Sequence, residues 1–546
     1  MQNFDFKKYG ALKEARPLQE KVLPEIIKAF DTKKFFILEA PTGIGKSYIT
    51  LTLANYYANQ KIQIDDRIFS GSSILVNQKI LQQQYINENW ININNKNKMI
   101  DNINSSVNYF CDSLPNLGIT CAQVHRIKKI DSQVCNNCKY YRDKRNYVEN
   151  KIGLTNMQYY LNLSAYTKDL PFRKLLIIDE AHCIEEQILN FISIEINEHT
   201  ILSKFKLLIP QIYKDQDLIN WLHDVLLPKM TEEKERYEAL AEPLLNLKTK
   251  SKVQENELKK ILEEVEFLDK YGCKINTMLN YWTSQTWVLT KEISDGGHNK
   301  YVFRPILINE FTKDLLFDKA DKVLLLSATI LKQKEFCQNI GIDLNDSQFL
   351  TLPSPFPKEN RPIYPISAGS MSMKNIENTM PNLISAVEKL MEHHKGQKGI
   401  IHVHTYSIGD KIFKNVAKKY QKRLLFHTSL NRESVLEHHI NSKNDTVLLT
   451  PSMSEGVDLK EELSRFQIIC KIPFPYLGDK RIQMKNQLQP WWYSFITVKT
   501  IVQSLGRSIR SKDDHAVSYI LDSDWEFFYK RNSNLFPPWI KEAIIQ

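Results

Sequence analysis

Residues 40–47 read APTGIGKS, and this stretch decides how the rest of the chain is interpreted. An apolar run, FFILEA from Phe35, precedes it, and SYITLTLANYYA, which has helical spacing, follows the lysine. Strand, glycine loop and helix in this order are typical of a phosphate-binding loop, here with alanine in the place of the first glycine. The stretch therefore predicts a nucleotide-binding α/β domain.

Each residue type in this loop has a physical role at a phosphate. The two glycines would let backbone N–H groups close around phosphate oxygens, while Lys46 would neutralise the β/γ charge and Ser47 would hold Mg²⁺. The residues expected to bind the nucleotide and its Mg²⁺ are Thr42, Gly43, Gly45, Lys46 and Ser47.

A second motif, DEAH at residues 179–182, directly follows the apolar run LLII. The carboxyl end of a parallel strand lies at the edge of the sheet where nucleotides bind. Asp179 is expected to hold Mg²⁺ through water, and Glu180 to orient or deprotonate the water that attacks the γ-phosphate. A single carboxylate after a strand is more often a helix cap, but the four residues of DEAH together, downstream of the loop, favour catalysis.

Apolar runs divide the chain into two successive α/β domains. The first domain has predicted strands at 72–77, 174–179 and 322–329, in addition to the one before the loop. The strands predicted for the second domain span 399–405, 423–428, 445–451, 466–474 and 516–522. Two insertions interrupt the first domain, and one of them holds four cysteines. The other, at 190–305, is expected to be helical, because Leu258, Ile261, Leu262 and Val265 recur at the spacing of an amphipathic helix. The polar, Asn-rich stretch 88–106 is expected to be a loop.

Two arginines near the C-terminus could act on the transferred phosphate. Arg507 and Arg510 lie three residues apart, so on a helix they would share one face. Surface arginines with this spacing are common, but the combination of a phosphate-binding loop with a second α/β domain favours a role in stabilising the transition state.

Four of the eight cysteines form a group in the sequence. Cys111, Cys121, Cys135 and Cys138 are separated by nine, thirteen and two residues. Four thiolates bind either tetrahedral zinc or an iron–sulfur cluster, and one C-x-x-C pair with two single cysteines favours the cluster. Basic residues surround the group, among which Tyr140, Tyr141 and Tyr147 are expected to stack on bases. A solvated basic face is the alternative.

Together these motifs resemble the superfamily 2 helicases of the XPD/DinG type. In that family's terms residues 40–47 are motif I, 179–182 motif II, 327–329 motif III, 454–458 motif V and 503–510 motif VI. The resemblance implies that Gln503 belongs to the catalytic set and that Gly456 and Asp458 contact the nucleotide. Gln19 falls where helicases often have an adenine-sensing glutamine.

The resemblance also implies a domain plan and a 4Fe-4S cluster. Two RecA-like motor domains would occupy 1–104 with 151–189 and 306–345, and 346–546. The cluster domain would occupy 105–150 and a helical arch 190–305. The implied activity is ATP-driven translocation on single-stranded DNA, from 5′ to 3′, with unwinding of forked DNA in repair.

Two other functions stay open on the sequence. One is an ATP-switched clamp that binds damaged or junction DNA without unwinding it, although such a clamp would not need Glu180. The other is an RNA-directed DEAH helicase, in which an inserted cysteine domain is not typical. A requirement for deoxyribose on the loading strand would separate the two enzymes.

Composition sets the remaining limits. The net charge is +10 with a pI near 8.9, which favours polyanion partners. Apolar residues make up 42% of the chain, yet no run approaches the roughly 20 residues of a membrane span. The N-terminus lacks the apolar core of a signal peptide, so we expect the chain inside the cell, cytoplasmic or at the nucleoid or nucleus. We further expect a monomer with repair proteins as partners.

Overall fold

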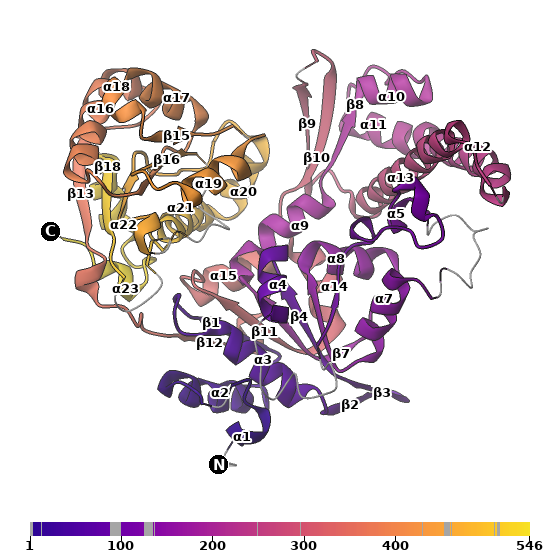
Figure 1. Cartoon of the computed structure of the whole chain (residues 1–546), viewed down its shortest axis with the longest axis horizontal. Helices are drawn as coiled ribbons and strands as arrows, with labels where there is room; N and C mark the ends of the chain where they lie inside the picture. Colours follow the sequence, from indigo (N-terminus) through magenta and orange to yellow (C-terminus); the bar gives the residue numbers. More distant parts are fainter. Residues whose placement is uncertain are drawn as a thin grey trace.

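The computed structural model describes residues 4–545 except 13, 88–99, 125–134, 136, 248, 295, 429, 452–458, 460, 507 and 510–513. Two parallel sheets form the cores of two α/β domains, and an insertion stands beside the second domain (Figure 1). In the described ranges no helix is both long and apolar enough to cross a membrane.

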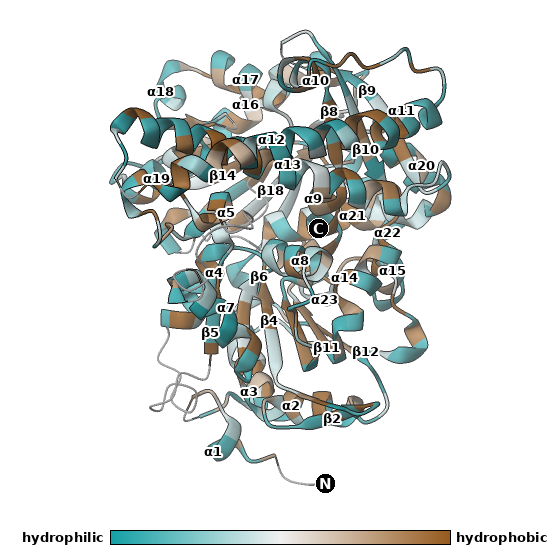
Figure 2. Cartoon of the chain, turned by 90° about the vertical axis from the view of Figure 1, so that its right-hand side faces the viewer, coloured by the Kyte–Doolittle hydropathy of each residue, from teal (hydrophilic) through white to brown (hydrophobic). Residues whose placement is uncertain are grey.

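The first sheet contains seven parallel strands in the described part of the chain, in the order β12-β1-β11-β7-β4-β6-β5. The strands are β1 (Phe35–Glu39), β4 (Ser72–Val76), β5 (Ile100–Ile103), β6 (Ile152–Asn156), β7 (Arg173–Asp179), β11 (Ala320–Ser327) and β12 (Ser347–Thr351). Every residue of β1 and β4 is buried because helices cover both faces, which explains their unbroken apolar sequence. Figure 2 shows these apolar residues on the central strands.

Two expectations about this sheet are corrected. The stretch 88–106 is not all loop, because β5 pairs with β6 at its end; residues 88–99 lie outside the described part. The boundary expected at 345/346 is too early, because β12 pairs with β1 and belongs to the first sheet. Both strands lie at the edges of the sheet, where short polar strands lack the apolar signature of the centre.

The second sheet has the order β13-β18-β17-β14-β16-β15 and is also parallel. Its strands are β13 (Ile363–Gly369), β14 (Gly399–His402), β15 (Leu424–Phe426), β16 (Val447–Thr450), β17 (Phe466–Ile469) and β18 (Val517–Asp522). Five of the six coincide with predicted strands. The helices are α16 (Ile376–His393), α17 (Tyr406–Asn415), α18 (Lys418–Gln421), α19 (Arg432–Asn441), α20 (Lys480–Leu488), α21 (Pro490–Leu505), α22 (Asp524–Asn532) and α23 (Pro538–Lys541).

The insertion combines helices with a small sheet. Its helices are α10 (Glu198–Phe205), α11 (Asp215–Trp221), α12 (Leu227–Asn246) and α13 (Lys252–Tyr281), with a π-helical turn at Leu222–Leu226. Its strands β8 (Ile194–Asn197), β9 (Trp287–Ile293) and β10 (Asn299–Pro305) form an antiparallel sheet that the helical prediction missed. The predicted apolar face of α13 is confirmed, since Leu258, Ile261, Leu262 and Val265 are buried.

The cysteine segment packs on this insertion. Its helices are α5 (Cys121–Val124) and α7 (Lys139–Glu149), and Cys111, Ile119 and Val124 share one hydrophobic cluster with the apolar face of α13. The remaining elements of the first domain are α1 (Phe6–Tyr9), α2 (Pro17–Ala29), α3 (Lys46–Tyr57), α4 (Lys79–Asn87), α8 (Met157–Tyr166), α9 (Ile184–Ile192), α14 (Asn309–Leu315), α15 (Gln333–Ile340) and the hairpin β2 (Lys61–Ile64) with β3 (Arg67–Ser70).

One hydrophobic cluster continues from the first domain into the second. It includes Ile178 on β7, Ile188 on α9, Phe303 on β10, and Val498 and Ile501 on α21. The two domains and the base of the insertion therefore share a core, and α21 lies against the edge of the first sheet at which β7 ends.

Candidate nucleotide site and cysteine segment

The phosphate-binding loop connects β1 to α3, as its sequence predicts. Gly43 and Gly45 both have left-handed backbones, with φ of 85° and 86°. A Cβ atom at Gly43 would lie 2.5 Å from the Phe356 ring, and one at Gly45 would lie 2.5 Å from Gln19 Nε2. Both positions therefore need glycine for backbone freedom and for space.

The glutamine noted near the N-terminus lies against this loop. Gln19, on α2, is buried and donates from Nε2 to Ile44 O at 2.9 Å, while its Oε1 accepts from Arg16 N at 2.8 Å. The Arg16 guanidinium donates to Gly43 O. These bonds hold the backbone of the loop at Gly43 and Ile44.

Motif II lies at the end of β7, beside Lys46. Lys46 Nζ is 3.5 Å from Glu180 Oε1. Asp179 is buried and accepts from the Tyr85 hydroxyl at 2.9 Å. Burial and the neighbouring Glu180 carboxylate raise the pKa of Asp179 to about 6. Metal binding at this carboxylate would act in the opposite direction, because a cation favours the ionised form.

Glu180 has an unusual backbone. Its φ is 54°, in the left-handed region that non-glycine residues seldom adopt. The turn leaves the carboxylate partly exposed at the sheet edge, with Oε2 at 3.2 Å from His182 Nδ1. Such strained positions cluster at functional sites, where the surrounding structure holds them.

A hydrogen-bond path connects motif II to the second domain. His182 Nδ1 is 2.7 Å from Ser327 Oγ, which accepts from Thr329 N at 3.0 Å. Gln503 Nε2, on α21, donates to Thr329 Oγ1 at 3.5 Å. The three predicted motifs II, III and VI are thus adjacent, although they lie far apart in the sequence.

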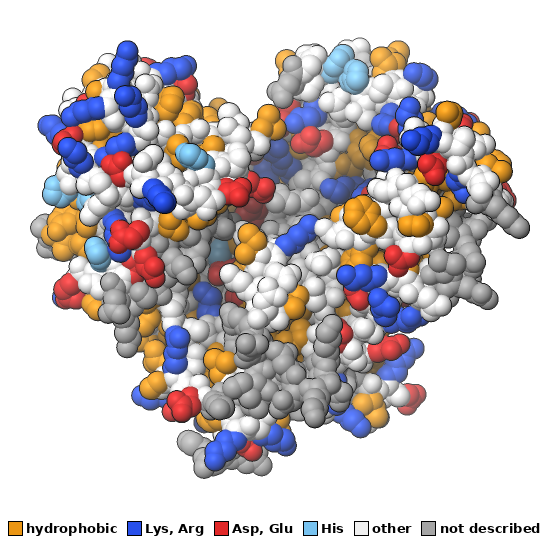
Figure 3. All heavy atoms as spheres, viewed as in Figure 1, with side chains coloured by type: hydrophobic (Ala, Val, Ile, Leu, Met, Phe, Trp, Pro, Cys, Tyr) orange, Lys and Arg blue, Asp and Glu red, His pale blue; other side chains and the backbone are white. Residues whose placement is uncertain are grey.

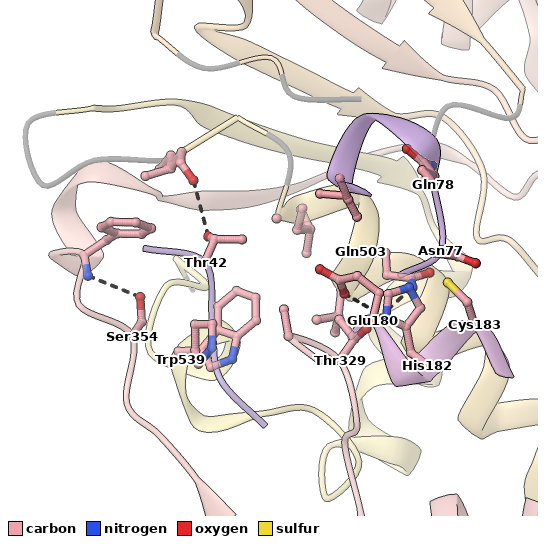
Figure 4. Close-up of a pocket in the computed structure, with 18 of the residues that line it drawn as sticks. Thr42, Asn77, Gln78, Glu180, His182, Cys183, Thr329, Ser354, Gln503 and Trp539 are labelled. Atoms are coloured by element: carbon pink, nitrogen blue, oxygen red, sulfur yellow. Dashed lines mark hydrogen bonds and ion pairs between the residues drawn. The ribbon is translucent and has the colours of Figure 1, made fainter. Parts of the chain in front are cut away.

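A cavity of about 320 Å³ separates the two domains at this point (Figure 4). Its polar lining residues include Thr42, Glu180, His182, Thr329 and Gln503, and its apolar lining residues include Phe356, Val502 and Trp539. Thr42 Oγ1 donates to Ile509 O at 3.5 Å, so the loop also contacts the segment that contains motif VI. Sequence reasoning missed Tyr85, Phe356 and Trp539, since none stands in a motif.

Four predicted site residues, Gly456, Asp458, Arg507 and Arg510, lie outside the described residues. Their neighbours Gly506 and Ile509 line the cavity.

The cysteine segment brings its thiols into one environment. An antiparallel bridge between Phe110 and Thr120 places Cys111 beside Cys121, and Cys138 N donates to Cys135 O at 3.2 Å. The pKa of the Cys121 thiol is raised by burial and by the negative charge of the other three thiols when ionised. In the ranges that the structure describes, no group of three or more His, Cys, Asp or Glu side chains has a metal-binding arrangement.

The aromatic part of the prediction for this segment is wrong for two residues. Tyr140 and Tyr147 are buried in the cluster between α7 and the first sheet, and the Tyr140 hydroxyl contacts the Tyr159 hydroxyl at 2.7 Å. They are therefore unavailable for stacking on bases. Phe110, next to Cys111, is instead 74% exposed. Of the basic residues expected around the cysteines, Arg126, Lys128 and Lys129 lie outside the described residues.

Known proteins resemble the chain in sequence and structure. A helicase C-terminal domain family matches residues 387–543, and the type III restriction enzyme res subunit family matches 12–208. A probable ATP-dependent helicase of Methanocaldococcus jannaschii is 21% identical and covers 94% of this chain and 92% of its own. The ATP-dependent DNA helicase DinG of Photobacterium profundum is 27% identical over 43% of this chain and 36% of its own.

A solved structure of an XPD helicase has a TM-score of 0.63 at 16% identity, covering 96% of this chain and 99% of that one. At this identity the likeness concerns the fold. It confirms the predicted architecture of two RecA-like α/β domains.

Proposed function

Because the chain is a superfamily 2 helicase of the XPD/DinG type, we propose that it is an ATP-dependent DNA helicase that moves along single-stranded DNA from 5′ to 3′. The observation that carries the proposal is the path from Glu180 through His182, Ser327 and Thr329 to Gln503. The path connects Glu180, proposed to orient the attacking water, to helix α21 of the second domain. A motor needs such a connection, because hydrolysis must be coupled to movement between the domains.

The site residues take the following roles. The loop amides and Lys46 bind the ATP phosphates, Ser47 and Asp179 hold Mg²⁺, and Glu180 orients the attacking water. Arg507 and Arg510 stabilise the charge that develops on the γ-phosphate, with Gly456 and Asp458 beside the nucleotide. Closure across the cavity brings these arginines to the phosphates and moves the second domain along the strand.

The DNA strand passes between the second domain and the insertion. Figure 3 shows a deep hollow there, whose walls carry Lys and Arg as well as Asp and Glu side chains. The basic side chains follow the phosphates of a single strand without reading its sequence. The domain division follows the family plan, with an arch at 190–305 and a second motor domain that begins after Thr351. The process that this activity serves is DNA repair.

Cys111, Cys121, Cys135 and Cys138 hold a 4Fe-4S cluster in this proposal. Support comes from the thiolate chemistry of four cysteines and from the mutual influence of their charges. The cluster would supply a covalent anchor for the segment that packs on α13, with the exposed Phe110 at the junction of the duplex.

Strand separation on two partial duplexes tests the function. Anaerobically purified protein should open a substrate with a 5′ single-stranded tail and leave one with a 3′ tail closed, in the presence of ATP and Mg²⁺. The Lys46→Ala variant should open neither, because it lacks the charge that binds the phosphates. If DNA stimulates hydrolysis but neither duplex opens, the clamp is the better function. Opening only of RNA-tailed duplexes would indicate an RNA helicase.

A serine substitution tests the cluster. Cys111→Ser should lose iron and unwinding while DNA-independent ATP hydrolysis persists, since Cys111 lies away from the nucleotide site. Cys273→Ser, on α13 and outside the group of four, is the matched control. Equal iron content in both variants would contradict the proposed ligand set.

A further inference from the structure

A buried carboxylate just after motif II accepts hydrogen bonds at both of its oxygens. Glu185, in the first turn of α9, accepts at Oε1 from Lys485 Nζ and from Arg481 Nη2, the latter at 2.9 Å. Its Oε2 accepts from Asn339 Nδ2 at 2.9 Å and from Trp492 Nε1 at 3.2 Å. The carboxylate thus accepts from four donors. Glu185 and the four residues that donate to it are called the Glu185 cluster.

The members of the Glu185 cluster come from both motor domains. Glu185 and Asn339 lie on α9 and α15 of the first domain, while Arg481 and Lys485 lie on α20 and Trp492 on α21 of the second. Lys485 has no exposed surface, donates also to Asn339 Oδ1 at 2.8 Å, and lies 4.7 Å from the centre of the Trp492 ring. Separation of α20 from α9 would leave buried charges unpaired, which is costly.

The same helix also holds the base of the insertion. Arg481 Nε donates to Pro305 O at 2.8 Å and its Nη2 to Ile306 O at 3.2 Å, where the chain leaves β10. Just before α20, Asp479 pairs with Arg304 at 3.0 Å. Helix α20 is therefore attached to motif II's helix and to the insertion at one place.

Among the described residues, the hydrogen bonds between the two domains at the cavity are fewer and mostly longer than those of the Glu185 cluster. Those from Thr42 to Ile509 O and from Gln503 to Thr329 are both 3.5 Å long, and Lys499 Nζ donates to His182 O at 3.2 Å. The second domain is thus held firmly at α20 and weakly at the phosphate-binding loop. A body fixed at one end and loose at the other turns about the fixed end.

We propose that the Glu185 cluster is the pivot about which the second domain turns when the cavity closes. Helix α20 stays bound to α9 and to the end of β10 during the turn, so the insertion keeps its place relative to motif II. Glu185 acts as a positioning residue: it holds the start of α9, three residues after His182, and so the strained turn at Glu180. This inference rests on the proposed function for its effect on hydrolysis, but the pivot itself concerns packing alone.

The test removes one donor of the Glu185 cluster and keeps the Glu185–Arg481 pair. In Lys485→Met, kcat for DNA-stimulated ATP hydrolysis should fall about tenfold while KM for ATP changes less than about twofold, because the loop still binds phosphates. Hydrogen exchange should accelerate in residues 179–192 and 303–306. Gln487→Met, on an exposed position of the same helix, should change neither quantity.

A second variant covers the case in which Lys485→Met does not fold. Trp492→Phe removes the indole N–H and part of the ring volume but keeps an aromatic ring beside Lys485, so it should show the same exchange pattern with about a threefold loss of kcat. Wild-type exchange rates in both segments, or a kcat that falls only in proportion to folded protein, would overturn the pivot. If the wild type shows no DNA-stimulated hydrolysis, the proposed function fails, and the exchange data still decide the pivot.

Discussion

Asp179 and Glu185 are buried carboxylates six residues apart, yet their surroundings shift their pKa values in opposite directions. Asp179 accepts from the Tyr85 hydroxyl and from Glu180 N, and it lies beside a second carboxylate; its pKa is raised. Glu185 accepts from four side chains, two of them cations, and its pKa is lowered despite burial, chiefly by Lys485 and then by Arg481. Lys46 lowers the pKa of Asp179 less than burial and Glu180 raise it, whereas two cations bind Glu185 directly.

This difference in pKa indicates which of the two carboxylates is suited to bind a cation. A buried carboxylate that is costly to ionise becomes favourable only when a cation arrives, which is the property of a metal ligand. A carboxylate that already has two cations and two further donors has no capacity left and serves the structure. The three predictions below test this contrast between Asp179 and Glu185.

The largest effect is expected on hydrolysis when Asp179 is changed. Asp179→Asn should lower kcat for ATP hydrolysis about 1,000-fold, equivalent to about 4 kcal/mol, because the metal is no longer held. In Mg²⁺-free buffer the same variant should be more stable than the wild type by up to about 3 kcal/mol, since a disfavoured charge is removed. Steady-state kinetics and urea unfolding measure the two quantities. A loss of both activity and stability would make Asp179 a structural acid.

The next effect is expected on stability when Glu185 is changed. Glu185→Gln should lower the free energy of unfolding by about 3 kcal/mol, because Lys485 and Arg481 then face each other without a negative partner. Glu186→Gln, at the exposed neighbouring position, should change it by less than about 0.5 kcal/mol. Equal free energies of unfolding for the two variants in urea would show that the Glu185 cluster does not contribute to stability.

The smallest effect is expected in the pH dependence of these differences. Because the folded-state pKa of Glu185 is lowered from 4.5, the wild type's advantage over Glu185→Gln should persist above pH 4.5 and shrink below it. Because that of Asp179 is raised from 3.8 to about 6, the gain in Asp179→Asn should be full above pH 6 and vanish towards pH 3.8. Each difference should change by at most about 1.4 kcal/mol per pH unit. Parallel pH profiles of the two variants would contradict the contrast.

Much of the fold follows from local patterns. The buried central strands were predicted because unbroken apolar runs mark strands covered on both faces, and the face of α13 because its apolar residues recur at helical spacing. Strands β5, β6, β12 and β13, the hairpin β2–β3 and the sheet β8–β10 were missed. Strand β6 is buried, but its sequence IGLTN is not an unbroken apolar run; the others are edge or partly exposed strands whose polar residues carry no such signal.

The candidate site divides in the same way. Lys46, Asp179 and Glu180 are recognisable because their roles depend on the segment that carries them: strand, turn and helix fix the side chains at the sheet edge. Tyr140 and Tyr147 show the limit, since their residue type suited base stacking and only their burial excluded it. Phe356 and Trp539 line the cavity because the linker and the C-terminal segment return to the loop.

The sequence by itself determined the chemistry of the nucleotide site, because a phosphate-binding loop and the acidic end of a strand are local structures formed by consecutive residues. Only the tertiary structure decided what joins the domains. Glu185 and Lys485 lie 300 residues apart, and no periodicity or motif pairs them. A charged side chain specifies what kind of partner it needs, but the fold decides which partner it meets.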